Sequence, residues 1–137
     1  MYQKVRFGRT GLLTSRHALG PIPFIHSWKK GLALTDIPPE QQANVRQIVN
    51  RALASGINHF ETAPYYGTGE IQLGEALAHH PRDSYILQVK IDPQVDKGEF
   101  KDQLSRSLQT LGVQQVDLLT LHGINNMGIP LTDNGSL

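Results

Sequence analysis

Three apolar segments of this sequence each carry, near the C-terminal end, one polar side chain of a kind used in acid–base chemistry. In chain order they are Glu61 in residues 57–63, Lys90 in residues 84–92 and His122 in residues 116–123. A carboxylate or an ammonium group inside an apolar strand is costly unless a partner of opposite charge lies beside it. We therefore expect Glu61 and Lys90 to form a pair, with His122 near them.

The turn after the first segment adds a phenol to this set. Tyr66 lies between Tyr65 and Gly67, just beyond a strand, where the loops of α/β folds collect catalytic groups. Taken alone, each residue also has a structural explanation. Glu61 and Tyr66 can be a polar strand cap and part of a Tyr-Gly turn, and His122 can be a core or rim histidine. A lysine within an apolar strand is harder to explain in this way, because buried lysines need a carboxylate partner.

Hydrophobic periodicity predicts strands that alternate with amphipathic helices. The expected elements are a β-hairpin at residues 2–14, strands at 17–20, 57–63, 84–92 and 116–123, helices at about 39–55, 70–78 and 100–111, and a long loop at 24–38. This order predicts an α/β fold with a parallel sheet and outer helices, in one domain that spans residues 1–137. In a barrel of such strands the C-terminal ends meet at one mouth, where the candidate residues would gather.

The composition is that of an ordinary globular protein, and it excludes several kinds of site. The 137 residues have a formal net charge of +1 and contain no cysteine, so we expect neither a disulfide nor a metal site. No cluster of lysine and arginine indicates nucleic acid, and no apolar run reaches the length that spans a membrane. The expected location is the cytoplasm, because the first residues are too polar for a signal peptide.

A series of short motifs runs through nearly the whole chain. They are Phe7-Gly8-Arg9-Thr10-Gly11-Leu12, Leu19-Gly20, Gly56-Ile57-Asn58-His59-Phe60, Thr62-Ala63, Tyr66-Gly67, Glu70, Leu73-Gly74, Val89-Lys90, Ser107-Leu108-Gln109-Thr110-Leu111-Gly112 and Val116-Asp117-Leu118-Leu119-Thr120-Leu121-His122-Gly123. With these motifs the sequence resembles the aldo-keto reductase family. The resemblance implies the N-terminal half of a (β/α)8 TIM barrel, with barrel strands 1 to 4 preceded by a β-hairpin.

The same resemblance implies an enzyme that reduces small aldehydes and ketones with NADPH at a tetrad of aspartate, tyrosine, lysine and histidine. Three members of the tetrad correspond to Tyr66, Lys90 and His122, while Glu61 stands where the family has its aspartate. The cofactor-binding residues expected on this basis, at the nicotinamide end, are Gly20, Pro21, Ile22 and Glu61.

The tetrad residues and their counterpart suit the proton transfer that carbonyl reduction requires; they are Glu61, Tyr66, Lys90 and His122. Hydride transfer builds negative charge on the carbonyl oxygen, and a phenol can supply the proton that neutralises it. The ordinary pKa of tyrosine, about 10, is too high for this near neutrality, but a lysine cation beside the phenol lowers it. We therefore expect Tyr66 to act as acid and base, with Lys90 lowering its pKa. Glu61 would hold the lysine, and His122 would orient the substrate.

The chain stops after the fourth of the eight strands of such a barrel, which takes about 250 residues. Three explanations stand side by side: a longer natural chain, a truncated reading frame, or two half-barrels that pair. We expect the isolated chain to be inactive and to self-associate through the open strand edge at residues 116–122. The alternative function is that of a non-catalytic family member that binds a nucleotide or a protein partner.

Overall fold

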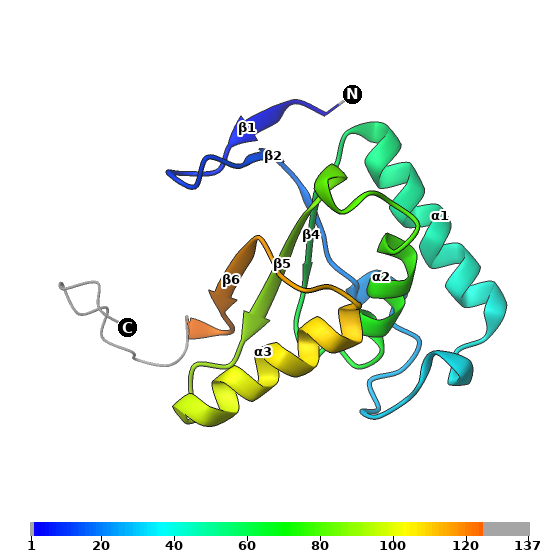
Figure 1. Cartoon of the computed structure of the whole chain (residues 1–137). Coiled ribbons are helices and arrows are strands. Elements are labelled where there is room, and N and C mark those ends of the chain that lie inside the picture. Colours follow the sequence, from blue (N-terminus) through cyan, green and yellow to red (C-terminus); the bar gives the residue numbers. More distant parts are fainter. Residues whose placement is uncertain (1, 125–137) are drawn as a thin grey trace.

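The computed structural model describes residues 2–124 (Figure 1). In chain order the elements are β1 (Lys4–Arg6), β2 (Leu13–Ser15), β3 (Ala18–Leu19), the 3₁₀ turns η1 (Ile22–Phe24) and η2 (Leu34–Asp36), α1 (Pro39–Ser55), β4 (His59–Thr62), α2 (Gly69–Leu77), the 3₁₀ turn η3 (Arg82–Ser84), β5 (Ile86–Ile91), α3 (Lys97–Leu111) and β6 (Leu118–Leu121). The predicted alternation of strands and helices is confirmed.

Strands β3 to β6 form one parallel sheet in which each strand lies beside the next one in sequence. The helical connections all step in the same direction across the sheet, and α1, α2 and α3 cover one of its faces (Figure 1). The predicted α/β fold is therefore present. Because the strands are parallel, the residues near their C-terminal ends lie at the same end of the sheet.

The core lies between the sheet and the helix layer. The strands supply the fully buried side chains of Phe60, Leu87, Val89 and Ile91. The helices supply Val45 and Val49 from α1, Leu73 and Leu77 from α2, and Leu111 from α3. Successive strand residues point to opposite faces, so Glu61 and Lys90, which alternate with core residues, point away from the helices.

Local signals set the ends of the helices. Gly56 ends α1 in the left-handed conformation, with φ of 93°, and its N–H donates to the carbonyl oxygen of Ala52. Helix α3 begins at Lys97, earlier than the apolar spacing predicts, because Oδ1 of Asp96 accepts hydrogen bonds from the N–H groups of Gly98 and Glu99. Apolar spacing marks only the face of a helix that packs, whereas the cap marks its true start.

The hairpin β1–β2 lies at the N-terminal end of the sheet (Figure 1). The side chain of Asn58, the residue before β4, accepts from the N–H of Ser15 at 2.7 Å and donates to the carbonyl of Leu13 at 3.0 Å. Phe7 packs edge-on against His59, with ring centres 5.8 Å apart. The hairpin therefore covers the end of the strands opposite the candidate site and leaves their C-terminal ends open.

The strands are shorter than the apolar segments that predicted them. β4 covers His59–Thr62 instead of residues 57–63, and β6 covers Leu118–Leu121 instead of 116–123. Strand pairing stops where the chain turns, while the apolar residues continue into the turn. As a result Glu61 and Lys90 are each the last residue but one of a strand, and His122 lies one position beyond β6.

Two other predictions need correction. The predicted loop at 24–38 is partly ordered into η1 and η2, where Oδ2 of Asp36 accepts from the N–H of Ala33 at 2.8 Å. Ser84, expected to begin a strand, is instead the last residue of η3. The sequence also predicts a turn at Asn134-Gly135, a dipeptide typical of turns, and this position lies outside the described residues. Within residues 2–124, no helix is long and apolar enough to cross a membrane, and no three potential metal ligands cluster.

Candidate active site

Glu61 and Lys90 form an ion pair at the C-terminal end of the sheet. Nζ of Lys90 donates to Oε1 of Glu61 at 2.9 Å, and the two side chains are 17% and 31% exposed, respectively. The strands that carry them are neighbours, with Glu61 opposite Gln88, two positions before the lysine. The predicted pair is therefore present, on the face of the sheet that the helices leave free.

The pair changes the acid–base behaviour of the lysine. Burial works to lower the pKa of Lys90, but Tyr66 and the Glu61 carboxylate together outweigh it and raise the pKa above its ordinary value. Lys90 is therefore a cation at neutral pH, although it sits in a partly buried site. A permanent positive charge is thus fixed at the mouth of the sheet.

Tyr66 lies directly over this charge. Nζ of Lys90 is 5.0 Å from the centre of the Tyr66 ring. The tyrosine begins a tight turn after β4, in which its N–H donates to the carbonyl of Ala63 at 3.0 Å and its own carbonyl accepts from Gly69 at 2.7 Å. The turn brings the phenol back over the end of the sheet, so that tyrosine and lysine meet although they lie on different elements.

The segment at residues 26–28 holds the tyrosine turn in place. The hydroxyl of Thr68 accepts from the N–H groups of His26 and Ser27, both at 3.1 Å, and the N–H of Thr68 donates to the carbonyl of Ser27 at 2.9 Å. This brings Trp28, which is 61% exposed, edge-on to Tyr66 with ring centres 6.5 Å apart. Sequence reasoning missed Thr68, because its partners lie some 40 residues away and no local pattern marks them.

His122 completes the cluster from the end of β6. Its ring centre lies 5.5 Å from that of Tyr66, and the two rings meet edge-on. Burial is the largest influence on its pKa, and together with Lys90 it lowers the value below the ordinary one, while Asp92 and Glu61 oppose the shift. The imidazole is therefore neutral at neutral pH, with one N–H available to donate. Glu61, Tyr66, Lys90 and His122 thus lie together.

The residues after β3 lie at the rim of this cluster. A Cβ atom on Gly20 would lie 3.2 Å from Oε1 of Glu61, and Pro21 packs so closely on Gly69 that a Cβ there would meet its ring at 2.8 Å. Ile22, which follows, is 53% exposed. The Glu61 side chain therefore occupies the space beside Gly20, while Ile22 offers an uncovered apolar surface on which a flat ring could lie. Ile22 and the carboxylate of Glu61 are thus the groups at this rim that could hold the nicotinamide end of a dinucleotide.

A second row of polar side chains lies below the ion pair on the same face of the sheet. Nε2 of His59 is 2.8 Å from Oε1 of Gln88, and Nε2 of Gln88 donates to the hydroxyl of Thr120 at 3.1 Å. The three residues come from β4, β5 and β6. Strand alternation places each of them on the face of the tetrad, but their mutual contacts depend on the strand register, which the sequence alone leaves undetermined.

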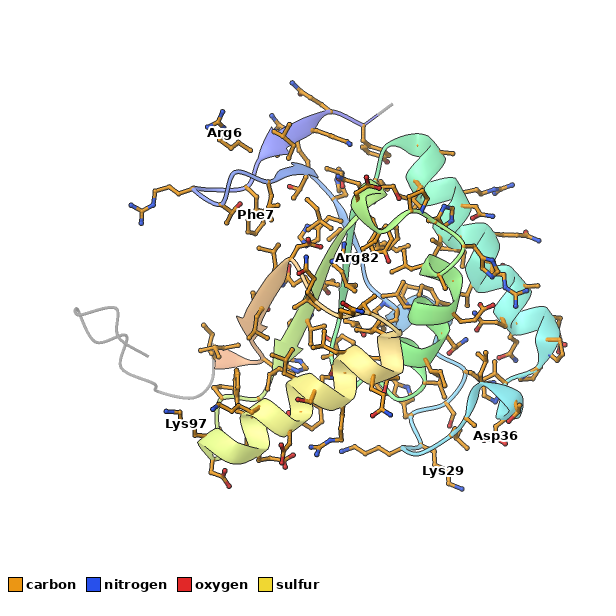
Figure 2. The ribbon with its side chains drawn as sticks, in the orientation of Figure 1. Arg6, Phe7, Lys29, Asp36, Arg82 and Lys97 are labelled. Atoms are coloured by element: carbon orange, nitrogen blue, oxygen red, sulfur yellow. The ribbon has the colours of Figure 1, made fainter. Side chains whose placement is uncertain are left out.

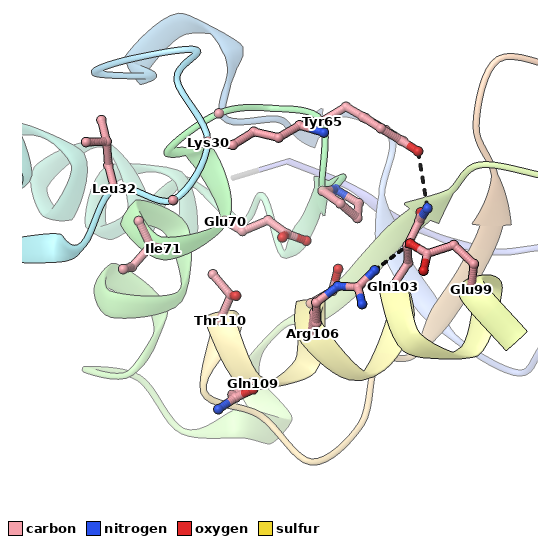
Figure 3. A pocket seen from close by; sticks show the side chains of 14 residues that line it. Lys30, Leu32, Tyr65, Glu70, Ile71, Glu99, Gln103, Arg106, Gln109 and Thr110 are labelled. Atoms are coloured by element: carbon pink, nitrogen blue, oxygen red, sulfur yellow. Dashed lines mark hydrogen bonds and ion pairs between the residues drawn. The ribbon is translucent and has the colours of Figure 1, made fainter. Parts of the chain in front are cut away.

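A cavity of about 730 Å³ lies outside the cluster, between α2, α3 and the loop that carries Lys30 (Figure 3). Tyr65 and Glu70 line it, and Arg106 pairs with Glu99 on its wall at 2.5 Å. None of Glu61, Tyr66, Lys90 and His122 lines this cavity. It is therefore not the mouth at which the candidate catalytic groups meet.

Comparisons with known proteins show what this chain is similar to. The model of the aldo/keto reductase family matches residues 28–126. D-arabinose 1-dehydrogenase of Saccharomyces cerevisiae is 30% identical over 107 residues, which are 70% of this chain and 31% of that protein. An NAD/NADP-dependent indole-3-acetaldehyde reductase of Schizosaccharomyces pombe is 32% identical over 77% of this chain and 37% of its own length.

Solved structures show the same relationship. A putative aldo-keto reductase of Pseudomonas aeruginosa superposes with a TM-score of 0.69 at 26% identity, over 90% of this chain and 47% of the other. A thermostable aldo-keto reductase gives a TM-score of 0.70 at 24% identity, which supports the fold. The chain thus spans about a third of the length of the curated relatives that it matches and has the architecture of a partial TIM barrel. It belongs to the aldo/keto reductase family.

Proposed function

We propose that this chain is the N-terminal part of an NADPH-dependent reductase of small aldehydes or ketones, and that it is inactive by itself. The observation that carries the proposal is the cluster of four side chains at the C-terminal end of the sheet. Lys90 lies 2.9 Å from Glu61 and 5.0 Å from the ring of Tyr66, and Tyr66 lies 5.5 Å from His122. Such a constellation combines a proton donor, a fixed cation and a neutral imidazole.

Tyr66 is the proton donor in this proposal. Its hydroxyl gives a proton to the carbonyl oxygen as negative charge develops there, and the ammonium group of Lys90 stabilises the phenolate that remains. Glu61 holds this ammonium in place, since an unpaired lysine at this depth would be costly. The pair thus keeps the charge where the phenolate forms.

His122 orients the substrate. Because the pKa of its imidazole is lowered by burial and by Lys90, the ring is neutral and can donate one N–H to the carbonyl oxygen without adding a second cation. Trp28, exposed and edge-on to Tyr66, offers an aromatic wall to the substrate. The carbonyl group would therefore lie between Tyr66 and His122.

The cofactor residues of the proposal are Gly20, Pro21, Ile22 and Glu61. Bound NADPH supplies the hydride. Ile22 exposes an apolar surface for a flat ring, and the Glu61 carboxylate lies against Gly20 at the same rim. Support comes from the name of the Schizosaccharomyces pombe relative, which is NAD/NADP-dependent, and from an aldo-keto reductase of the same fold, solved as a complex with NADPH at 16% identity.

The test supplies the chain with a second half-barrel. We would co-express the 137-residue chain with the C-terminal half of the Pseudomonas aeruginosa neighbour and follow NADPH oxidation with a panel of aldehydes. We expect no turnover from the chain alone and measurable turnover from the assembled pair. Tyr66→Phe should lower this turnover by about 100-fold or more, because it removes the acid.

Tyr85→Phe is the matched control. Tyr85 is a buried tyrosine that packs on Phe60 in the core, away from the tetrad, so its loss of a hydroxyl should leave turnover unchanged. An assembled pair that binds NADPH but reduces no aldehyde would overturn the proposal and favour the non-catalytic alternative. So would a Tyr66→Phe pair as active as the parent pair.

A further inference from the structure

Two aromatic rings hold the imidazole of His122. Its centre lies 5.8 Å from that of Tyr65, with an angle of 50° between the planes, and 5.5 Å from that of Tyr66, nearly edge-on. The backbone N–H of His122 donates to the carbonyl of Ile91 at 2.8 Å, but within residues 2–124 no side chain hydrogen-bonds to the imidazole. The backbone hydrogen bond thus fixes the position of the His122 Cα, and the rings of Tyr65 and Tyr66 determine the orientation of its imidazole.

Tyr65 is fixed from outside the candidate active site. Its hydroxyl donates to Oδ2 of Asp92 at 3.3 Å and accepts from Nε2 of Gln103 at 3.2 Å, the contact drawn in Figure 3. Gln103 is a buried residue of α3, and Oδ1 of Asp92 accepts from the N–H of Gln94 at 2.8 Å. Lys30 lies over the Tyr65 ring, 5.0 Å from its centre. The Tyr65 side chain is therefore anchored to the helix layer by its hydroxyl, while its ring contacts His122.

We propose that Tyr65 is a positioning residue, which fixes the orientation of the His122 ring beside Tyr66. The assignment rests on the proposed function, because only there does His122 orient a substrate. Both hydrogen-bonding roles of the Tyr65 hydroxyl are occupied, by Asp92 and Gln103, so only its ring faces the site. The two adjacent tyrosines thus have separate tasks, one in proton transfer and one in positioning.

The pKa of His122 provides a second, independent measure of how its ring is surrounded. Burial and Lys90 lower the pKa of His122, while Asp92 and Glu61 raise it. The ring of Tyr65 supplies part of that burial, since its centre is within 6 Å of the imidazole. A smaller side chain at position 65 would admit water, so the pKa of His122 would move up toward its ordinary value of about 6.5.

The experiment is proton NMR of the whole 137-residue chain, without cofactor or substrate. In the parent chain, we expect cross-peaks between the ring protons of Tyr65 and His122. In Tyr65→Leu, the cross-peaks between Tyr66 and His122 should weaken several-fold, and the pKa of His122 should rise. Tyr65→Phe keeps the ring and loses only the hydroxyl contacts to Asp92 and Gln103, so the cross-peaks and the pKa should stay closer to the parent values than to those of Tyr65→Leu.

Tyr2→Leu is the matched control, because Tyr2 makes a similar edge-on contact with another histidine, His17, at 5.3 Å. It should leave every signal of His122 unchanged. Missing cross-peaks between Tyr65 and His122 in the parent would overturn the proposal. So would parent-like His122 signals in Tyr65→Leu, or a Tyr65→Phe chain that behaves like Tyr65→Leu.

Two readouts do not depend on the folding of the leucine variant. If Tyr65→Leu does not fold, the parent cross-peaks and the phenylalanine variant decide the question, because both keep an aromatic ring at position 65. None of these measurements needs turnover. A chain that fails to support carbonyl reduction can therefore still pass or fail this test, and the two proposals fail separately.

Discussion

The side chain of Glu61 fits at the end of the sheet because Gly20, which lies against it, has no side chain. Glutamate is longer than aspartate by one carbon–carbon bond, about 1.5 Å. The extra length brings Oε1 within 2.9 Å of Nζ of Lys90, and it also brings that oxygen to within 3.2 Å of the place where a Cβ on Gly20 would lie. The expectation that the ion pair persists with glutamate is confirmed, and Gly20 provides the room.

Gly20→Ala should therefore destabilise the chain through Glu61. We expect a loss of about 1 kcal/mol in the free energy of unfolding, because the methyl group crowds Oε1 and disturbs the ion pair. In the Glu61→Asp background the shorter side chain relieves the contact, so the loss should nearly vanish. Urea unfolding of the parent, both single variants and the double variant measures this coupling. Equal losses in the two backgrounds would contradict it.

At the scale of elements, the tyrosine turn and the segment at residues 26–28 are built as one unit. Gly67 has φ of +52°, and a Cβ there would lie 2.0 Å from the carbonyl oxygen of Ser27 and 2.7 Å from Cα of Trp28. Only glycine lets the two backbones approach so closely. The position of Trp28 beside Tyr66 follows from this approach.

Gly67→Ala should separate the two segments. We expect a loss of more than 2 kcal/mol in the free energy of unfolding, because the clash with backbone atoms adds to the cost of the left-handed conformation. Gly8→Ala is the control, since Gly8 has φ of +55° but nothing within 4 Å, and it should cost about 1 kcal/mol. Trp28 fluorescence should shift only in Gly67→Ala. Equal losses for the two variants would refute the close-approach argument.

A buried carboxyl group lies where α2 packs against α3. Glu70 is 7% exposed and lies close to Ser107 of α3, and burial raises its pKa to about 7, with the Ser107 hydroxyl opposing the shift. The folded chain therefore holds this proton more tightly than the unfolded chain does. Between pH 4.5 and about 7 the unfolded chain loses the proton first, so stability falls as the pH rises through this window.

Glu70→Gln should remove this pH dependence. The parent should lose roughly 3 kcal/mol of stability across the window relative to the glutamine variant, as the shift in pKa implies. Urea unfolding of both chains at several pH values gives the difference, which also cancels the opposite contribution of His122. Glu40→Gln, an exposed change at the start of α1, is the control. Parallel stability curves for the parent and Glu70→Gln would contradict the prediction.

At the scale of the whole molecule, the sheet has two free edges within residues 2–124. β3 pairs only with β4, and β6 pairs only with β5. Leu119 of β6 is 44% exposed, although its partner Val89 on the same face of the sheet is fully buried, and Ile124 is 39% exposed. An unpaired strand with exposed apolar side chains favours pairing with another chain.

The 137-residue chain should therefore self-associate at micromolar concentration, which sedimentation can measure. Leu119→Lys should shift it toward monomer, because a charge on an edge strand opposes strand pairing. Leu13→Lys is the control, since Leu13 is 56% exposed but lies in the hairpin at the other end of the sheet. A parent chain that sediments as a stable monomer would contradict the prediction, as would equal effects of the two lysine variants.

Much of the fold and of the candidate site could be predicted from the sequence. Apolar alternation and helical spacing are local patterns, so they predict the parallel α/β sheet and place Glu61, Lys90 and His122 near strand ends that must share one edge. The family motifs then identify Tyr66. Apolar spacing could not predict the limits of β4 and β6, which strand pairing sets, or the early start of α3 and the order within the loop at 24–38, where the side chains of Asp96 and Asp36 accept backbone hydrogen bonds.

The sequence by itself determined the kind of chemistry this chain can take part in, because that depends on residue types and on their order along the strands. Only the tertiary structure decided which other residues contact and position them. Gly20 makes room for Glu61, Thr68 ties the tyrosine turn to Ser27, and Gln103 anchors Tyr65. Each of these contacts joins residues roughly 40 positions apart, so it exists only once the helices have packed on the sheet and the strand register is set.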